Sequence, residues 1–461
     1  MTKLISICGA MAIAGAASAA GEDFPLTFRT IPAKDVMSFP GGSGSSASLS
    51  VTKPTKFKKE PKAVSRHALY GECRDTSTGA ALVFRLDESK GDARGYDRLI
   101  VDMNQNGDLT DDPVVQTVVL PGDRKVVSPE QLLFGPILAP AEKAVAGERP
   151  MYFARVYIYN RELLSSTRES PSLFIGQLML KAGWYLDTTV ELSGRKQKVG
   201  VYDGDSNLRL GDLSPPQTLT SSGERAWYFR PGDYLLVDAD GSGSFENDLL
   251  QSEAYPFAPI LYVDGKPYKV ALSQDYKFLR VEPWSEPLAE VALRPNGDNV
   301  KNLTVAWEGP GGNWQLIRPA VLQGKVMVPP GNYRLYACSL VGGSASRDQV
   351  LVSGTQRIPQ TPVSVASGQA NTLDCGGPVR VKVTANKARG DTRGMLNGDS
   401  SNATARSESV LNINAILVGS GGEVYSTFLK GDRFQARPPK PAFSIVQAGG
   451  KTVATGNLEY G

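Results

Sequence analysis

The stretch YDRLIVDMNQNGDLTDDP, residues 96–113, joins a strand-forming half to an acidic half that contains a glycine. The second half places oxygen-bearing side chains at loop positions 1, 3, 5, 7, 9, 10 and 11, counted from Asp102, with Gly107 at position 6. Calcium takes roughly six to eight oxygen ligands, and a central glycine permits the sharp turn that brings alternate side chains together. The stretch therefore predicts a loop for a hard cation, entered from a strand.

The loop resembles the calcium loops of the EF-hand, dockerin and thrombospondin type 3 families over about a dozen residues. It departs from the EF-hand because Pro113 stands where the bidentate glutamate is expected, and because a strand precedes it instead of a helix. The resemblance implies a Ca²⁺ site closed by Asp111 or Asp112, with the weak affinity of extracellular modules. Its expected ligands are Asp102, Asn104, Asn106, Asp108, Asp111 and Asp112.

The same arrangement occurs twice more along the chain. A second loop follows the strand-like residues 233–237 and has Gly243 at its central turn; its expected ligands are Asp238, Asp240, Ser242, Ser244, Glu246 and Asp248. A weaker third copy follows residues 198–202 and has Leu208 where the glycine is expected; it offers Asp203, Asp205, Asn207 and Asp212. Ordinary Asx turns are the alternative, since they use the same residue types. The clustered carboxylates favour a cation, because they would otherwise repel one another.

The N-terminal residues predict export. Residues 1–19 read as a secretory signal peptide, with Lys3, an apolar run over 4–16 and a small-residue cleavage site that ends at Ala19. No other segment approaches the roughly 18 apolar residues of a membrane span. We therefore expect a secreted, periplasmic or cell-surface protein. A net charge of +3 over 461 residues gives no field that would attract nucleic acid.

Short apolar runs separated by turn signals predict a mainly β, multidomain chain. We expect a flexible Gly/Ser- and Lys-rich segment over 20–62, a β unit with the first loop over 63–125, and a β unit with the other two loops over 150–285. A boundary is expected in the Pro- and Ala-rich residues 121–150. One β-sandwich should span 286–378, and 379–461 should be a second sandwich or a continuation of the first.

Two short motifs support the prediction of a mainly β chain, one in the 150–285 unit and one in the 286–378 sandwich. Asp264-Gly265 between apolar runs predicts a tight hairpin. Pro329-Pro330-Gly331-Asn332-Tyr333 resembles the turn-and-strand signature of immunoglobulin-like and carboxypeptidase-regulatory-like modules, which implies an anchoring role for Tyr333. As a whole, the chain resembles secreted bacterial proteins that combine strand-flanked calcium loops with immunoglobulin-like sandwiches, a resemblance that implies no activity.

Three cysteines remain after the predicted signal peptide. Cys338 and Cys375 lie in one C-terminal region, and the sequence leaves open either a disulfide between them or two buried thiols. Cys73 has no evident partner.

The sequence contains no recognisable catalytic motif, and its single histidine, His67, excludes a His-rich zinc site. We expect an exported calcium-binding structural or interaction protein, whose partner is a protein or glycan at the cell surface. Two alternatives stay open. A carbohydrate-binding or adhesive protein would need a row of exposed aromatic side chains, and a hydrolase would need a pocket with two carboxylates that bind no metal.

Overall fold

The computed structural model describes most of the chain. It covers residues 21–41, 44–65, 67–74, 81–90, 95–118, 130–159, 175–213, 216–221, 224–229, 232–246, 252–309, 311–343, 350–356, 361–389, 409–431 and 436–458. The predicted signal peptide and Asp248 lie outside these ranges. The described residues are nearly all strands and turns, with one short α-helix, α1 (Ala33–Val36), so the prediction of a mainly β chain is confirmed.

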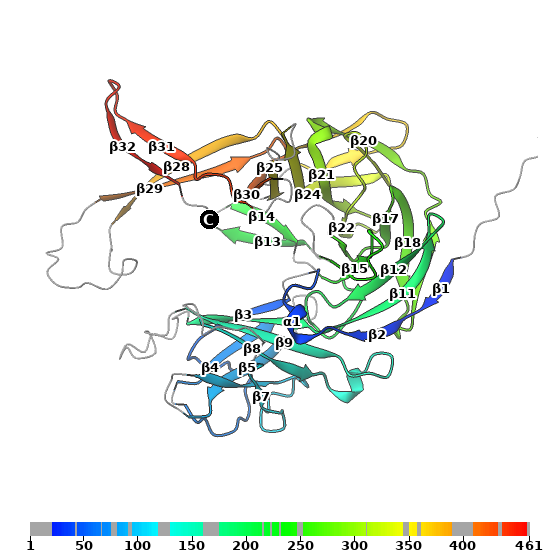
Figure 1. Cartoon of the computed structure of the whole chain (residues 1–461), viewed down its shortest axis with the longest axis vertical. Coiled ribbons are helices and arrows are strands. Elements are labelled where there is room, and N and C mark those ends of the chain that lie inside the picture. The colour runs from blue at the N-terminus through cyan, green and yellow to red at the C-terminus, as the bar shows by residue number, and fades with distance from the viewer. Residues whose placement is uncertain are drawn as a thin grey trace, which may run out of the picture.

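Two four-stranded antiparallel sheets form what we call the N-terminal lobe, at the bottom of Figure 1. Their orders are β3-β10-β9-β8 and β4-β5-β6-β7. The two sheets are hydrogen-bonded to each other at both edges. Ser50, after β3, exchanges backbone hydrogen bonds with Tyr70 of β4, and the N–H of Val118, after β7, donates to the carbonyl of Leu133 of β8 at 2.7 Å. The strands are β3 (Ser45–Leu49), β4 (Leu69–Arg74), β5 (Ala81–Glu88), β6 (Tyr96–Val101), β7 (Val115–Gln116), β8 (Glu130–Leu138), β9 (Met151–Ile158) and β10 (Gly176–Ala182).

The boundary that we expected within 121–150 is not present. Strand β8 lies inside the Pro- and Ala-rich stretch, and it is a neighbour in space of the residues that directly follow β7. Side chains from both sheets, among them Leu69, Phe84, Phe134 and Val156, are buried in one core. The strands up to β10 therefore belong with the first loop.

The central lobe, on the right of Figure 1, consists of a five-stranded sheet, β16-β15-β12-β11-β2, and a four-stranded sheet, β1-β19-β18-β17. Its strands, with the separate hairpin β13–β14, are β1 (Glu22–Pro25), β2 (Thr27–Thr30), β11 (Trp184–Leu192), β12 (Arg195–Tyr202), β13 (Pro216–Ser221), β14 (Glu224–Phe229), β15 (Tyr234–Val237), β16 (Ala254–Pro256), β17 (Ile260–Val263), β18 (Lys266–Leu272) and β19 (Phe278–Pro283).

The prediction of a flexible segment over 20–62 is wrong. Strand β1 pairs with β19, β2 pairs with β11, and β3 pairs with β10. Within the Lys-rich part, the ring of Phe57 is buried and the backbone of Lys59 bridges to Asp108 of the first loop. All of these partners lie far along the chain, so composition alone could not indicate them.

The C-terminal lobe is a β-sandwich at the top of Figure 1. The sheet β23-β20-β27 packs on the sheet β22-β21-β24-β25-β30-β29-β28, with β26 paired to β24, and their shared core includes Val291, Leu303, Leu335 and Tyr425. The strands are β20 (Ala289–Pro295), β21 (Val300–Glu308), β22 (Trp314–Ile317), β23 (Lys325–Val328), β24 (Gly331–Gly342), β25 (Val350–Gln356), β26 (Val363–Val365), β27 (Asn371–Cys375), β28 (Arg380–Arg389), β29 (Ser409–Val418) and β30 (Glu423–Lys430).

Strands β28 to β30 extend this one sheet, so the residues after 378 continue the first sandwich. The hairpin of β31 (Ala442–Val446) and β32 (Thr452–Asn457) projects from the sandwich at the upper left of Figure 1. Among the described residues, no helix is long and apolar enough to span a membrane.

The predicted turns form as expected. Asp264 and Gly265 have φ angles of 50° and 76° and join β17 to β18 as a hairpin. The buried Tyr333 donates from its hydroxyl to the carbonyl of Pro329 at 2.5 Å, which anchors the start of β24. Cys338 and Cys375 are free, buried thiols, which is the second of the two alternatives that the sequence left open.

Candidate metal centres

Each predicted loop begins where a strand ends. The first follows β6 at Asp102, the third follows β12 at Asp203, and the second follows β15 at Asp238. Strands β12 and β15 are antiparallel neighbours, so the second and third loops lie at opposite ends of this pair. The third loop instead faces the first, across a cavity of about 170 Å³ lined by Gln105 and Leu208 among others.

The three loops share one backbone path. Residues at positions four and six of each loop have positive φ angles: Gln105 60° and Gly107 81°, Ser206 57° and Leu208 72°, Gly241 76° and Gly243 83°. A leucine in the left-handed region costs roughly 1–2 kcal/mol. The third loop accepts this strain at Leu208 and keeps the same turn, so its missing glycine does not change its geometry.

The first carboxylate of each loop points inward and is buried. Oδ2 of Asp102, Asp238 and Asp203 accepts the N–H of the residue at position six at 2.8, 2.9 and 3.2 Å, respectively. The exposed fractions of these three residues are 2%, 5% and 0%. A cation beside these inward-pointing oxygens would be shielded from solvent and would therefore interact with them strongly.

The third loop gathers one group of carboxylates. Oxygens of Asp203, Asp205 and Asp233 lie within 4.8 Å of one another, which is close enough to hold one metal ion. Asp233 was missed from the sequence, because it lies outside the twelve-residue window. It directly precedes β15, whose first residue pairs with the last residue of β12, and so it falls beside the loop that follows β12. Its carboxylate accepts the N–H groups of Gly204 at 3.0 Å and Asp212 at 2.9 Å.

Charge repulsion is strong in this group. Asp203 and Asp233 are both fully buried. Burial raises the pKa of Asp233 well above its usual value, and the charge of Asp203 raises it further. Burial also raises the pKa of Asp203, against the opposing effect of a hydrogen bond from Tyr152. A divalent cation among these oxygens would stabilise the ionised forms.

The second loop gathers another group, from Asp238, Asp240 and Glu253, again within 4.8 Å. Glu253 was also missed, because it too lies outside the loop window. It directly precedes β16, and the antiparallel pairing of β16 with β15 places it where β15 ends and the loop begins. Its carboxylate accepts the N–H groups of Ala239 and Glu246, both at 2.7 Å, and burial raises its pKa. Oδ1 of Asp238 is buried and has no hydrogen-bond partner within the described structure. An electron-rich oxygen in this setting is suited to a cation.

The first loop is organised differently. No group of three carboxylates of the kind above forms there among the described residues. Asp108 turns outward to pair with Lys59 at 3.2 Å, and Asp111 accepts a hydrogen bond from the side-chain amide of Asn106 at 2.8 Å. Burial raises the pKa of Asp112 to about 7, and the charges of Asp102 and Asp111 contribute to this shift. Lysine therefore supplies part of the neutralisation here.

Several predicted ligands lie outside the carboxylate groups. The hydroxyls of Ser242 and Ser244 are exposed and 3.1 Å apart, and Glu246 contributes its N–H to Glu253. Asn207 donates from its amide nitrogen to Asp212 at 2.6 Å. Of the predicted ligands, those that lie within a carboxylate group are Asp203 with Asp205, and Asp238 with Asp240.

The chain matches no protein-family model, no curated protein and no solved structure. The donors of the two groups are all carboxylate oxygens, which suit hard cations such as Ca²⁺ or Mg²⁺ better than the softer metals that prefer nitrogen and sulfur.

Proposed function

We propose that this protein is an exported, calcium-binding structural protein in which Ca²⁺ orders loops between strands and fastens the N-terminal lobe to the central lobe. The observation that carries the proposal is the position of the Asp203 group. Its loop belongs to the central lobe, yet Asp203 accepts a hydrogen bond from Tyr152 of β9 and the carbonyl of Asp205 accepts one from Ser45 of β3, at 2.6 and 2.5 Å. An ion bound there would stabilise both the loop and the junction.

Calcium is favoured over magnesium by the ligand geometry. Mg²⁺ requires near-ideal octahedral coordination and keeps several waters, whereas Ca²⁺ accepts a larger and more irregular set of carboxylate and carbonyl oxygens. The three carboxylates of each group, two from a loop and one from the start of a neighbouring strand, would form part of such a set. Because the carboxylates converge only in the folded chain, binding free energy would add to folding stability.

Export is supported by the signal-peptide pattern of residues 1–19. The weak affinity expected of the first loop would suit a compartment with millimolar calcium. An adhesive role through a row of exposed tryptophans has less support, since Trp184 and Trp307 are buried and Trp284 and Trp314 are half-buried.

The proposal is tested by counting bound calcium. Equilibrium dialysis at millimolar Ca²⁺ should show at least two ions per chain for the wild type, one for each carboxylate group. Asp203→Asn and Asp238→Asn should each lose one ion. Asp374→Asn is the matched control, because that side chain is exposed on β27, away from the loops. Equal binding by all four proteins would contradict the assignment of these groups as calcium sites.

A further inference from the structure

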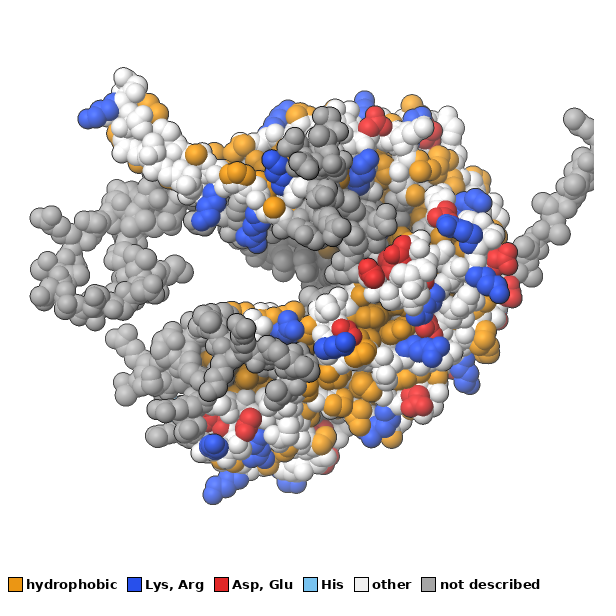
Figure 2. All heavy atoms as spheres, in the orientation of Figure 1, with side chains coloured by type: hydrophobic (Ala, Val, Ile, Leu, Met, Phe, Trp, Pro, Cys, Tyr) orange, Lys and Arg blue, Asp and Glu red, His pale blue; other side chains and the backbone are white. Residues whose placement is uncertain are grey.

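A continuous cleft crosses the three lobes. One hollow of about 520 Å³ lies between the N-terminal and central lobes, and another of about 360 Å³ lies between the central and C-terminal lobes. They share Tyr234, Ser252 and Ala254, so the central lobe forms a common floor. Hollows of this size are typical of sites for small organic ligands. The space-filling view shows the molecule hollowed between its lower and upper parts (Figure 2).

One end of the cleft is cationic. Lys181 on β10 is only 6% exposed, and its ammonium group donates to the carbonyl of Phe39 at 2.8 Å. Arg155 on β9 is paired with Met179, which places it on the same sheet face as Lys181, diagonally across the strands. Burial lowers the pKa of Lys181 to about 8, and the charge of Arg155 lowers it further.

Nothing in the described part of the chain neutralises this pair. No ion pair joins Lys181 or Arg155 to a described carboxylate, and the described lining of both hollows contains no Asp or Glu. Two like charges held together at a partly buried site destabilise the protein unless an anion is bound. Such a pair is suited to binding a negatively charged group.

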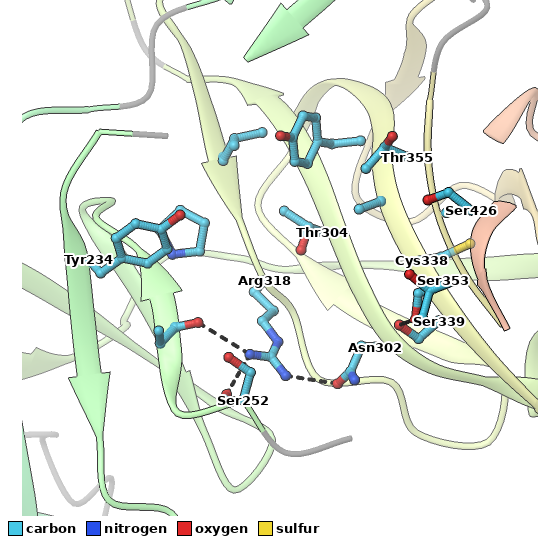
Figure 3. Close-up of a pocket in the computed structure, with 17 residues that line it drawn as sticks. Tyr234, Ser252, Asn302, Thr304, Arg318, Cys338, Ser339, Ser353, Thr355 and Ser426 are labelled. Carbon is cyan, nitrogen blue, oxygen red and sulfur yellow. Dashed lines mark hydrogen bonds between the residues drawn. The ribbon is translucent and has the colours of Figure 1, made fainter. Parts of the chain in front are cut away.

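The other end of the cleft is lined by hydroxyls. The sheet β21-β24-β25-β30 buries one face in the sandwich core and turns the other to the cleft (Figure 3). Across these strands, one row of paired residues consists of Asn302, Ser339, Ser353 and Thr427, and the next row includes Thr304 and Thr355. Ser339 and Ser353 are hydrogen-bonded at 2.8 Å. Neutral donors and acceptors in rows suit a ligand with many hydroxyls.

Arg318 fixes the floor between the two ends. Its guanidinium group donates to the carbonyl of Ser252 at 2.6 Å and to the side-chain carbonyl of Asn302 at 2.8 Å, and it stacks 4.8 Å from the ring centre of Tyr255. These bonds join the central lobe to β21 (Figure 3). The hydroxyl-lined end is therefore held at a fixed position relative to the floor of the cleft, as recognition of an extended ligand requires.

We propose that this cleft binds an acidic oligosaccharide, with an anionic group of the sugar against Lys181 and Arg155 and neighbouring hydroxyls against the Ser and Thr rows of the C-terminal lobe. The rings of Tyr157 and Tyr234, which line the same cleft, offer faces for the apolar sides of the sugar. The absence of acidic residues from the described lining also distinguishes this cleft from that of a hydrolase using two carboxylates.

The test is calorimetric titration of the full mature chain, in calcium, with three tetrasaccharides: tetragalacturonate, a heparin-derived tetrasaccharide and an uncharged galactose tetramer. The first two distinguish carboxylate from sulfate as the anionic group. We expect one or both to bind and the uncharged tetramer to bind at least about tenfold more weakly, a difference of 1.4 kcal/mol. If neither acidic tetrasaccharide binds at millimolar concentration, or if the uncharged one binds equally well, the proposal is overturned.

Variants locate the ligand. Lys181→Met and Arg155→Gln should each weaken binding about tenfold, whereas Lys382→Met, an exposed lysine of β28, should leave it unchanged. Thr304→Val removes one hydroxyl at constant shape and should weaken the tetrasaccharide severalfold without changing the affinity for inorganic phosphate. If Thr304→Val lowered the affinities for the tetrasaccharide and for inorganic phosphate equally, the site would bind small anions only, and the saccharide assignment would be overturned. Because Arg155 is half-buried, its variant keeps the test valid if Lys181→Met does not fold.

Discussion

The hydroxyl of Tyr152, on β9 of the N-terminal lobe, donates a hydrogen bond of 2.6 Å to the first carboxylate of the third loop, on Asp203 of the central lobe. Both residues are fully buried. This one bond links the packing of the two lobes to the charge at the candidate metal centre. A change in the packing should therefore alter metal binding, and a change in the charge should alter the stability of the junction.

Removing the hydrogen bond between Tyr152 and Asp203 should lower the free energy of unfolding more than removing a comparable bond to a neutral acceptor. Tyr152→Phe keeps the ring and leaves a buried carboxylate with one donor fewer, for which we expect a loss of about 1.5–3 kcal/mol in the free energy of unfolding. Tyr202→Phe is the matched control, since its equally buried hydroxyl donates to the neutral carbonyl of Ala182 at 3.0 Å. Its cost should be about 0.5–1.5 kcal/mol in urea unfolding. A smaller effect at Tyr152 than at Tyr202 would contradict the role of the bond.

The second loop should depend on Glu253 rather than Glu246. Only the carboxylate of Glu253 lies with those of Asp238 and Asp240. We expect Glu253→Gln to weaken calcium binding at this loop about tenfold, or 1.4 kcal/mol, and Glu246→Gln to change it by less than about twofold. Calorimetric calcium titration of the two variants decides between them. A larger loss for Glu246→Gln would return the site to the ligand set expected from the sequence.

Without metal, stability should fall as the pH rises from about 4 to about 7. The pKa of Asp112 is raised from 3.8 to about 7 in the folded protein, and those of Asp203 and Asp233 are raised as well. The folded state then binds more protons than the unfolded state, so the stability these groups contribute is present below pH 4 and is lost as the pH rises through their folded pKa values.

Unfolding temperatures in EDTA across this range provide the measurement. Carboxylates with lowered pKa values, such as Asp87 and Asp275, act in the opposite direction, but mainly below pH 4. Asp112→Asn should make the decline shallower, and saturating calcium should reduce it by holding the carboxylates ionised. A metal-free protein that becomes more stable between pH 4.5 and 7 would contradict the raised pKa values.

The two central glycines should differ in their tolerance of alanine. Gly107 and Gly243 have nearly the same φ, 81° and 83°. A Cβ atom at Gly107 would lie 2.6 Å from the carbonyl oxygen of Lys56, whereas one at Gly243 would meet nothing within 4 Å. Both variants share a backbone cost of about 1–2 kcal/mol. Gly107→Ala should be further destabilised by the clash, by about 1 kcal/mol or more in urea unfolding. Equal destabilisation by Gly107→Ala and Gly243→Ala would show that the backbone at Lys56 moves away from the added methyl group at no cost in stability.

Local features of the fold were predictable from the sequence. The run that ends at Val101 forms a strand, the residues from Asp102 form a tight acidic loop, and Tyr333 anchors its turn as expected. These features depend on neighbouring residues, whose preferences for strands and turns can be read directly.

The missing ligands depended on strand pairing. Asp233 and Glu253 each directly precede a strand that is antiparallel to the one leading into the loop, and that register brings them to the loop. For the same reason, β1 could not be predicted, because its partner β19 lies near the other end of the central lobe in sequence. Register between distant strands is set by the packed core as a whole.

The most direct test of the central claim is the thermal unfolding temperature of the chain from Ala20 onward, in EDTA and then over a titration to several millimolar Ca²⁺, with Mg²⁺ as the control. A ligand that binds only the folded state stabilises it by RT ln(1 + [L]/Kd), about 2.7 kcal/mol at a hundredfold excess over Kd. We predict a rise that is specific to calcium and is reduced by Asp203→Asn and by Asp238→Asn. An unfolding temperature that does not change with calcium would contradict the account and leave the three loops as metal-free turns.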